Sequence, residues 1–399
     1  MPSYDVIIIG AGSVGLPAAV FLAKEKIKTL VIDELASPGQ GQNKAAIGGV
    51  RATHSDPAKI QTCQLSLDVF SRWREEYGDD IHFKRGGYTF PVYDEEREES
   101  LRSLLVTQKQ HGLNIDWLDA QAMRELLPGL SPDGLRGGTH SPEDASVSPI
   151  LTARAFYHQA VKLGAAFAFG EKVTAIEGGR GGGAGGGGAG GARGARGGVR
   201  VVTTKASYSA GKVINAAGAK ASEVGRLMGL DLPVMPDSHE AGVTEPVKPF
   251  VPSMVVDIRG FPGSTNFYFY QEQQGHIIFC LTPEPIIPGQ NRDSTSSFLP
   301  LAAQRLIRLF PRLRNVRVRR VWRGLYPMTS DGVPIVDRPD GTDCFYVAVG
   351  FCGQGLMLGP GIALNLVSLI TRGMPILSPE IFASLSLSRD YSRPSEALR

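Results

Sequence analysis

The chain has 399 residues, of which 42 are Lys or Arg and 39 are Asp or Glu, giving a formal net charge of +3. So small an excess does not indicate nucleic-acid binding, and the length suits two domains or one large elaborated domain. No apolar run reaches the roughly 20 residues of a membrane-spanning helix, so no transmembrane segment is expected. The 4 cysteines are scattered without Cys-x-x-Cys pairs, which predicts no metal site, no disulfide framework and a cytoplasmic location.

The opening of the chain predicts a strand, a glycine turn, a helix and a second strand. Residues 6–9 form the apolar, β-branched run of a buried parallel strand. Gly10, Gly12 and Gly15 follow as G-x-G-x-x-G. In this spacing the glycines allow a tight turn, close approach of a pyrophosphate and close packing of the helix on the strand. We therefore predict a dinucleotide site here.

The second strand, residues 29–32, ends in Asp33 and Glu34. An acid at this position accepts hydrogen bonds from the ribose hydroxyls of an adenosine. The N–H groups at the start of the helix, from Ser13 and Val14 onward, are expected to face the phosphates. The motif does not choose between NAD and FAD. The structural alternative is a glycine-rich turn that merely closes a strand–helix–strand unit.

The next 20 or so residues are glycine-rich and polar without a period, which predicts a loop near the cofactor or, alternatively, a plain surface crossover. Within this loop, Arg51 and His54 are the residues whose side chains could bind or react with a ligand.

The remaining chain falls into four blocks. Residues 81–148 indicate a separate mixed block of helices and strands, and a helix follows from Pro149. The glycine-rich run 178–198 predicts a flexible hairpin insertion. Residues 226–321 alternate apolar and polar, which favours an antiparallel sheet. Residues 345–370 repeat the opening order of strand, glycine turn and helix, either to face a cofactor or only to pack closely.

Six stretches resemble the D-amino-acid oxidase/sarcosine oxidase superfamily of FAD-dependent oxidoreductases and follow the family order. They are the opening unit, the loop IGGVR, the segment from SVSPILTARAF to GEKVTAIE, KVINAAGAKASEV, GLYPMTSDGVPIV and YVAVGFCGQGLMLGPG. The chain is most similar to the β-subunits of heterotetrameric sarcosine oxidases and dye-linked proline dehydrogenases. Only the glycine-rich insertion is foreign to the pattern.

The resemblance implies an α/β fold: a discontinuous Rossmann-type FAD-binding domain with a second, α+β substrate domain built on an antiparallel sheet that covers the flavin. The FAD-binding domain would comprise residues 1–80, 149–225 and 322–399, and the substrate domain residues 81–148 and 226–321. The positions that match the family's FAD contacts are Gly10, Gly12, Ser13, Val14 and Gly15 (pyrophosphate), Asp33 or Glu34 (ribose), Gln42, Asn43, Lys44, Ala45 and Ala46 (loop beside the pyrophosphate), Val173 (adenine), Ala217 and Gly218 (turn by the cofactor), and Gly353, Gln354, Gly355, Leu356 and Met357 (flavin edge).

Departures from the family pattern refine this expectation. Gly324 lies where monomeric sarcosine oxidases hold FAD through a cysteine, so noncovalent FAD is expected. The strand at 275–281 lacks the family's oxygen-activating lysine, which favours a dehydrogenase over an oxidase. Tyr326 replaces the arginine of glycine oxidases, and Met357 replaces a family lysine. The sequence has no second G-x-G-x-x-G unit with a strand before it and an acid after it, so NAD(P)H is not the expected co-substrate.

The reaction that the resemblance implies is oxidation of a small amino acid or N-substituted amine, of the proline, hydroxyproline, sarcosine or glycine type. Hydride transfer to flavin N5 gives an imine, and no side-chain base is required if the amine binds neutral. Arg51 is the best candidate to bind the substrate carboxylate, with His54 and Arg323 behind it. An exposed strand arginine is the alternative for Arg323. Tyr268 and Tyr270 either shape the amine site or pack within the sheet.

The reduced flavin must pass its electrons to a quinone, a dye or a partner subunit, and both homo- and hetero-oligomers are open. Two alternatives to an independent enzyme remain: a noncatalytic FAD-binding assembly factor and a partner-dependent subunit of an electron-transfer complex.

Overall fold

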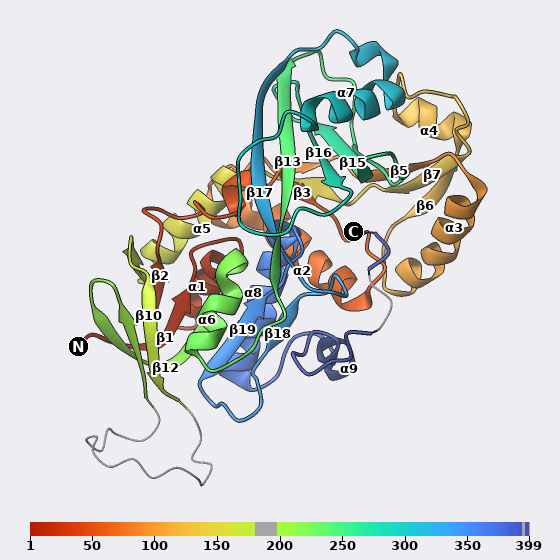
Figure 1. Cartoon of the computed structure of the whole chain (residues 1–399). Coiled ribbons are helices and arrows are strands. Elements are labelled where there is room, and N and C mark those ends of the chain that lie inside the picture. Colours follow the sequence, from red (N-terminus) through yellow and green to blue (C-terminus); the bar gives the residue numbers. More distant parts are fainter. Residues whose placement is uncertain (180–197, 393–395, 399) are drawn as a thin grey trace. The chain divides into compact units, whose positions relative to one another are not determined.

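The computed structural model describes residues 1–179, 198–392 and 396–398, and the chain divides into two compact units (Figure 1). Residues 180–197 of the predicted glycine-rich insertion lie outside the described residues. Unit 1 comprises Met1–Lys44, Ile150–Met235 and Pro327–Ser395, and unit 2 comprises Ala45–Pro149, Pro236–Tyr326 and Glu396–Arg399.

Unit 1 is built on a sheet whose central strands are parallel. Ile7 and Ile8 of its first strand are 0% exposed, because a parallel sheet buries both of its faces. In spatial order the parallel strands are β9 (Ala166–Phe169), β2 (Thr29–Asp33), β1 (Ser3–Ile9), β12 (Ser207–Asn215) and β19 (Phe345–Val349). Antiparallel strands extend it: β11 (Val199–Thr203) and β10 (Val173–Gly178) beside β12, and β18 (Ile335–Asp337) beside β19.

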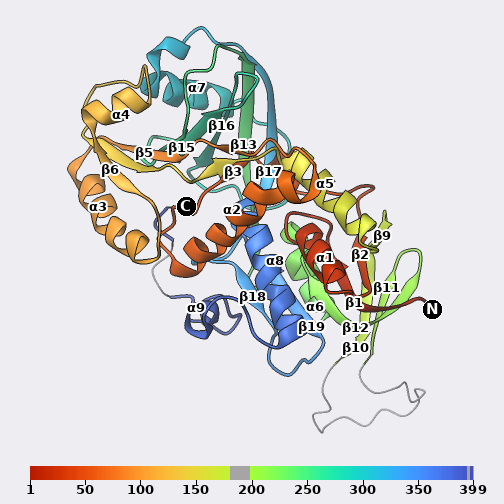
Figure 2. The same cartoon turned by 180° about the vertical axis from the view of Figure 1, so that it is seen from behind.

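Two helices from opposite ends of the sequence lie side by side in unit 1, α1 (Gly15–Lys24) and α8 (Gly355–Arg372) (Figures 1 and 2). A Cβ on Gly359 would overlap the carbonyl oxygen of Ser13, so glycine permits this approach. By length and composition α8 resembles a membrane-spanning helix, but 61% of its most apolar window of 18 residues is buried, as in a core helix. The other helices are α5 (Pro149–Lys162), α6 (Ala221–Leu227), α9 (Pro379–Ala383) and the short η2 (Gly218–Lys220), with η1 (Asn43–Ala45) at the unit boundary.

Unit 2 contains a largely antiparallel sheet of eight strands. Its register sets Phe90, Val256, Tyr268, Cys280 and Ala241 in one row across five neighbouring strands. Because side chains alternate along a strand, this row defines one face of the sheet, which we call the tyrosine face. In spatial order the strands are β17 (Val318–Met328), β13 (Met235–Pro246), β16 (His276–Pro283), β15 (Ser264–Gln271), β14 (Met254–Asp257), β5 (Tyr88–Val92), β7 (Gly137–Ser141) and β6 (Asp116–Asp119).

The opposite face of the sheet carries an apolar core. Phe267, Phe269 and Phe279 alternate with the tyrosine-face residues and pack with Phe298 and Leu306 of α7 (Phe298–Leu309). The other elements of unit 2 are α2 (Pro57–Tyr77), α3 (Glu95–Gln110), α4 (Ala120–Leu126), η3 (Pro311–Leu313) and a small sheet of β3 (Gly49–Val50), β8 (Ala145–Ser146) and β4 (Lys84–Arg85).

The compact units divide the chain differently from the predicted domains in four stretches and at Pro149. Residues 45–80, 322–326 and 396–399, with Pro149, belong to unit 2 although the sequence-based division assigns them to the FAD-binding domain. Residues 226–235 belong to unit 1 although that division assigns them to the substrate domain. The fold class is confirmed: unit 1 has a largely parallel sheet with helices, and unit 2 has a largely antiparallel sheet.

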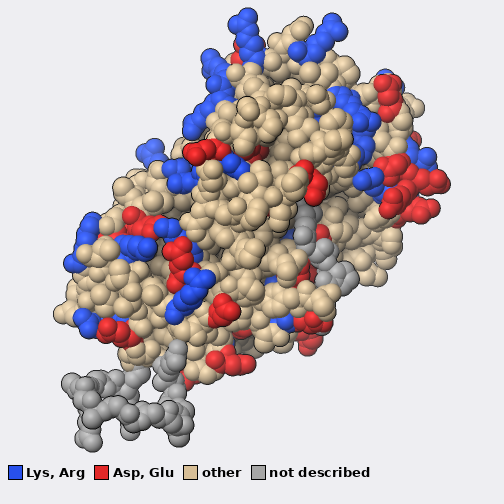
Figure 3. Space-filling model, viewed as in Figure 1, with Lys and Arg blue, Asp and Glu red and all other residues tan. Residues whose placement is uncertain are grey.

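Charged side chains of both signs are spread over the face shown in Figure 3. On that face Lys and Arg side chains gather along the top edge, and acidic side chains gather at the right edge.

Candidate functional site

The glycine turn between β1 and α1 is shaped for close backbone approach. Gly10 has φ 112°, in the region that favours glycine, and a Cβ there would overlap the carbonyl oxygen of Ala216. A Cβ on Gly15 would overlap the carbonyl oxygen of Gly10. At Gly12, by contrast, an added Cβ meets no heavy atom of the described residues within 4 Å. Two glycines thus serve packing within unit 1, and the third borders open space of the kind that a pyrophosphate fills.

Two features beside this open space suit an anion. The N-terminus of α1 has no side-chain cap, and its positive dipole end is free of acidic side chains in the first turn, although the Leu16 N–H donates to the Gly12 carbonyl at 3.1 Å and Pro17 carries no N–H. Gln354, at the N-terminus of α8, is also without a side-chain cap bond, and its buried Oε1 has no hydrogen-bond partner among the described residues. The two turns are adjacent, since a Cβ on Gly355 would lie 3.9 Å from the Cβ of Ser13. The predicted stretch Gly353–Met357 therefore lies beside the first glycine turn.

Asp33, the acidic residue at the end of β2, is hydrogen-bonded to this turn. Asp33 accepts hydrogen bonds from the N–H of Ala11 (2.7 Å) and the N–H of Leu35 (2.8 Å) through its two carboxylate oxygens. Burial raises the pKa of Asp33 above its ordinary value, and these two N–H groups oppose that shift. Glu34 instead makes an ion pair with Lys220, with 2.6 Å between oxygen and nitrogen. The two candidates for ribose binding thus differ in their partners, and Asp33 is the one joined to the glycine turn.

The remaining predicted FAD contacts in unit 1 lie around the same turn. Asn43 accepts a hydrogen bond from the Ser13 hydroxyl, at 2.8 Å, and Ala217 follows the Ala216 carbonyl that lies against Gly10. Val173 opens β10, two residues after Glu171, whose N–H donates to the Asp33 carbonyl at 3.0 Å. Gly218 begins η2, Gln42 is half-buried and Lys44 is exposed, with its Nζ 3.2 Å from Gln40 Oε1. Ala45 and Ala46 belong to unit 2, where the Ala45 carbonyl accepts a hydrogen bond from the Trp322 indole at 2.9 Å.

A separate polar cluster lies on the tyrosine face of unit 2. The hydroxyl oxygens of Tyr268 and Tyr326 are 2.6 Å apart, and both side chains are half-buried. The ring of Tyr326 stacks on the ring of His239, with 3.7 Å between centroids and 17° between planes. Burial raises the pKa of both phenols, so both keep their protons at neutral pH.

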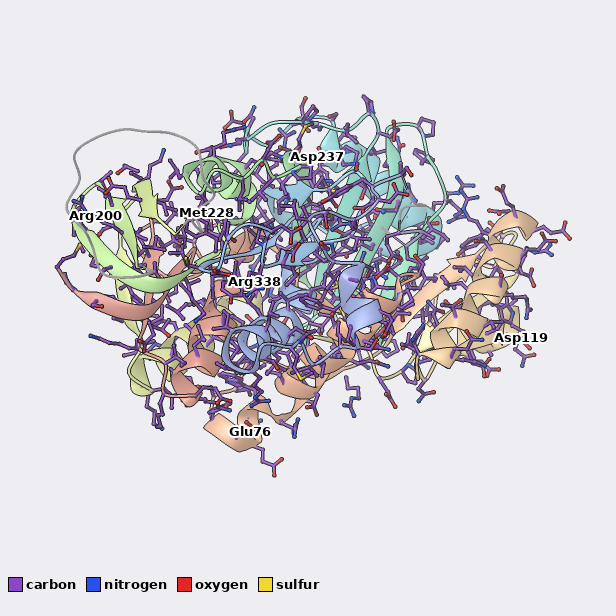
Figure 4. The ribbon with its side chains drawn as sticks, turned by 90° about the horizontal axis from the view of Figure 1, so that it is seen from below. Glu76, Asp119, Arg200, Met228, Asp237 and Arg338 are labelled. Atoms are coloured by element: carbon purple, nitrogen blue, oxygen red, sulfur yellow. The ribbon has the colours of Figure 1, made fainter. Side chains whose placement is uncertain are left out.

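His239 is the member of this cluster with an unused nitrogen. Its Nε2 lies 3.2 Å from Oδ2 of Asp237, which is labelled at the start of β13 in Figure 4. Its Nδ1 is buried and has no hydrogen-bond partner among the described residues. Burial, with a smaller contribution from the positive charge of Arg323, lowers the pKa of His239, whereas the bond to Asp237 raises it. The pKa of Asp237 is lowered, so its side chain is an ionised carboxylate. It accepts a hydrogen bond from the Nε2–H of His239, which leaves the lone pair on Nδ1 available.

Arg323 lies three residues before Tyr326 on β17 and is buried. Its Nη1 donates to the Asp293 carbonyl at 2.8 Å, in the loop where Thr295 donates to Glu240. Its Nε and Nη2 are buried and have no hydrogen-bond partner among the described residues. The charge of Arg323 acts on the pKa of His239, but no hydrogen bond joins the described Arg323 and Tyr268 side chains.

Arg51 and His54 are brought together inside unit 2. Arg51 is 6% exposed, its guanidinium donates to the carbonyls of Thr53 and Leu398, and it lies 5.7 Å from the ring centroid of Phe90. His54 is 0% exposed, with Nε2 3.5 Å from the Cys63 sulfur, and burial lowers its pKa well below the ordinary value. The region near Arg51 also borders Tyr270, whose hydroxyl donates to the Ile47 carbonyl at 2.6 Å.

The family of the chain follows from comparison with known proteins. A family model described as FAD dependent oxidoreductase (DAO) matches residues 5–369. The chain belongs to this family. The sarcosine oxidase β-subunit of Rhizobium meliloti (strain 1021) is 26% identical over 387 residues, which are 94% of this chain and 86% of that protein.

Two further proteins are similar to the chain over most of its length. Rat mitochondrial dimethylglycine dehydrogenase is 24% identical over 93% of this chain, which spans only 43% of that longer protein. The crystal structure of L-proline dehydrogenase from P. horikoshii matches with a TM-score of 0.86 and 26% identity, covering 98% of both chains.

Family membership makes this protein an FAD-dependent oxidoreductase, and the residues present fit FAD. The open space at Gly12, the uncapped start of α1, the unpartnered Gln354 oxygen and the acid at Asp33 all belong to the surroundings of the first glycine turn in unit 1. The predicted cofactor is thereby confirmed. Among the described residues, no group of three His, Cys, Asp or Glu side chains is arranged to hold a metal ion.

Sequence reasoning missed the Asp237–His239 pair and the partners of Arg51. A signal for the first was present: Asp and His two residues apart on a strand share a face. No local pattern links Arg51 to Leu398, because these residues are at opposite ends of the sequence.

Proposed function

We propose that this DAO-family protein oxidises a small amino acid or N-substituted amine that carries a carboxylate, and that the tyrosine face of unit 2 binds it. The observation that carries the proposal is the buried, unpartnered Nδ1 of His239 beside the Tyr268–Tyr326 pair. A neutral imidazole in this position is suited to an amine, since it can accept the proton of an ammonium group, which is far more acidic than the hydroxyl proton of an alcohol.

The roles of the protein side chains follow from their protonation states. A secondary or primary ammonium is protonated at neutral pH and must lose a proton before its α-carbon releases a hydride. We assign that proton to Nδ1 of His239, while Asp237 holds the tautomer through Nε2. The Tyr326 ring keeps the imidazole plane fixed by stacking, and the Tyr268 and Tyr326 hydroxyls are placed to orient the amine. FAD, when bound, supplies the two-electron acceptor for the hydride.

The ammonium loses one proton from nitrogen and one hydride from carbon, so the product is an iminium, the protonated form of the imine, which becomes the imine when it releases a second proton. We assign the substrate carboxylate to Arg51, whose guanidinium is the cation beside Phe90 of the tyrosine-face row. Arg323, whose Nη1 is bonded to the Asp293 carbonyl while its buried Nε and Nη2 have no hydrogen-bond partner among the described residues, is the second candidate. Two electrons must then leave the protein. The missing lysine in β16 favours a quinone, dye or partner subunit over oxygen, and the similarity to a protein named as a subunit supports a partner.

Anaerobic flavin reduction tests this function. The purified protein is mixed with sarcosine, proline, hydroxyproline or glycine, and the oxidised-flavin absorbance at about 450 nm is followed. Bleaching by one of these amines, and not by a 2-hydroxy acid of the same size, is the expected result. Slow recovery of the absorbance on admitting air would fit a dehydrogenase. A bound flavin that no amine bleaches would overturn the proposal and favour an assembly factor or a partner-dependent subunit.

A further inference from the structure

The C-terminal segment belongs to unit 2 and contains Glu396, a residue that is 3% exposed. Its Oε1 accepts hydrogen bonds from the N–H and the hydroxyl of Ser55, at 2.8 and 2.7 Å, and its Oε2 accepts one from the N–H of Asp56, at 3.3 Å. These N–H groups lie at the N-terminus of α2, which favours a negative charge. The carboxylate is therefore held by a specific set of donors.

A buried lysine reinforces this attachment. Nζ of Lys59 lies 3.3 Å from Oε2 of Glu396, and neither side chain has exposed surface. Nδ1 of His54 is 3.8 Å from the same oxygen and has no hydrogen-bond partner among the described residues. Lysine is almost never fully buried unless a carboxylate compensates its charge. The interior of unit 2 is thus matched to an acidic side chain at this point of the sequence.

Two residues later the segment reaches Arg51. Leu398 is 3% exposed and packs in an apolar cluster with Tyr88, Phe90 and Tyr270, against which the half-buried Tyr268 also packs. The Leu398 carbonyl accepts a hydrogen bond from Nη2 of Arg51. Arg51 also donates a hydrogen bond to the Thr53 carbonyl. Both of these acceptors are neutral carbonyl oxygens, whereas a substrate carboxylate would offer charged oxygens.

We propose that the C-terminal segment, Glu396–Leu398, is an internal ligand of Arg51 that competes with the substrate carboxylate. This inference rests on the proposed function, since it takes Arg51 as the carboxylate anchor. Glu396 holds the segment in place, and Leu398 covers the apolar surface beside the anchor. A carboxylate displaces the Leu398 carbonyl because a charge-assisted, two-pronged bond to a guanidinium is about twice as strong as a bond to a neutral oxygen.

The contact of Glu396 with Lys59 and the contact of Leu398 with Arg51 can be removed separately. A chain ending at Glu396 keeps the side chain that pairs with Lys59 but loses Leu398 and its carbonyl. Binding is measured by calorimetry on the flavin-loaded protein with cyclopentanecarboxylate, an amine-free acid of the size of proline, and with the neutral cyclopentanecarboxamide as matched probe. We expect the shortened chain to bind the acid about tenfold more tightly than the full chain, with the amide unchanged. Arg51→Lys in the shortened chain should abolish the gain, because lysine lacks the two-pronged geometry.

A second variant covers the case in which the shortened chain does not fold. Leu398→Ala retains the carbonyl but removes the apolar anchor, and a smaller gain in acid affinity is expected. Equal affinities of the full and shortened chains for the acid, in a protein whose flavin an amine still reduces, would overturn the internal-ligand proposal alone. Tighter binding of the acid together with a flavin that no amine reduces would support the internal ligand and overturn the proposed function.

Discussion

Asp237 and His239 face each other from positions two apart on β13, with 3.2 Å between the carboxylate Oδ2 and the imidazole Nε2. The pair fixes which nitrogen carries the imidazole proton, and it leaves the buried Nδ1 as a lone-pair acceptor. The charged and titratable groups around it are Asp237 on its own strand and Arg323 and Tyr326 on β17. The proton-accepting role proposed for His239 depends on this arrangement.

The first prediction concerns the pH dependence of flavin reduction. The folded-state pKa of His239 lies below its ordinary value of 6.5, because burial disfavours the imidazolium. The anaerobic reduction rate should therefore fall only when the pH drops below that ordinary value, as Nδ1 becomes protonated. His239→Gln should lower the rate by about 100-fold or more and remove this acid limb. Stopped-flow absorbance across pH 5–9, a window about the ordinary histidine pKa, measures both quantities.

Asp237→Asn serves as the matched control for His239→Gln. It leaves the imidazole in place but removes the charge that raises the pKa of His239, so the acid limb should move to lower pH and the rate should drop. An unaltered acid limb in His239→Gln would show that another group accepts the proton.

The second prediction separates the glycines of the first turn. Gly12→Ala places its Cβ in space that no described atom occupies, so the apoprotein should keep its thermal midpoint while FAD affinity falls about tenfold or more. Gly15→Ala should instead destabilise the protein itself, because its Cβ overlaps the Gly10 carbonyl. Scanning fluorimetry of the apoproteins and fluorescence titration with FAD give the two readings. Equal FAD affinity of Gly12→Ala and the wild type would remove the pyrophosphate from this position.

The third prediction decides between Asp33 and Glu34. Asp33→Asn should weaken FAD binding about tenfold or more, because an amide cannot accept hydrogen bonds from both ribose hydroxyls and both backbone N–H groups. Glu34→Gln should have little effect, since its carboxylate pairs with Lys220. The same titration measures both variants. A larger loss in Glu34→Gln than in Asp33→Asn would reverse the assignment.

The parts of the site that the sequence predicts well are those encoded in short local patterns. Gly10, Gly12, Gly15 and Asp33 all belong to one strand–turn–helix–strand unit, where spacing along the chain directly fixes spacing in the structure. The surroundings of Arg323 could not be predicted in this way, because its hydrogen-bond partner, the Asp293 carbonyl, lies in a separate loop earlier in the chain.

Contacts between distant segments could not be predicted from one sequence. Lys59 appears as an ordinary polar position of an amphipathic helix, and its burial makes sense only once the end of the chain is seen to supply Glu396. The resemblance to the DAO family identified Arg51 by motif, but it gave no information on the Leu398 carbonyl that meets it. Local patterns define the cofactor site, whereas the surroundings of the substrate anchor depend on tertiary pairing.

The last prediction concerns the buried Lys59–Glu396 pair and acid stability. Lys59 and the neighbouring donors hold the pKa of Glu396 well below its ordinary value. A group with a lowered folded pKa contributes stability above its unfolded pKa, about 4.3, and loses it as the pH falls toward the folded value. Glu396→Gln should cost about 3 kcal/mol at pH 7 if Lys59 stays buried, and it should flatten the decline in stability below about pH 4.3.

Urea unfolding of unit 2, followed by tryptophan fluorescence at neutral and acidic pH, measures this contribution. Asp116→Asn is the matched control: its pair with Lys109 has a similar distance, 3.1 Å, but lies on the surface with the two side chains 48% and 74% exposed. Its loss should cost well under 1 kcal/mol. The double variant Lys59→Met/Glu396→Gln should recover much of the stability, because no buried charge remains unpaired. If Glu396→Gln and Asp116→Asn shift the unfolding midpoint equally, the C-terminal segment does not keep Lys59 buried in solution.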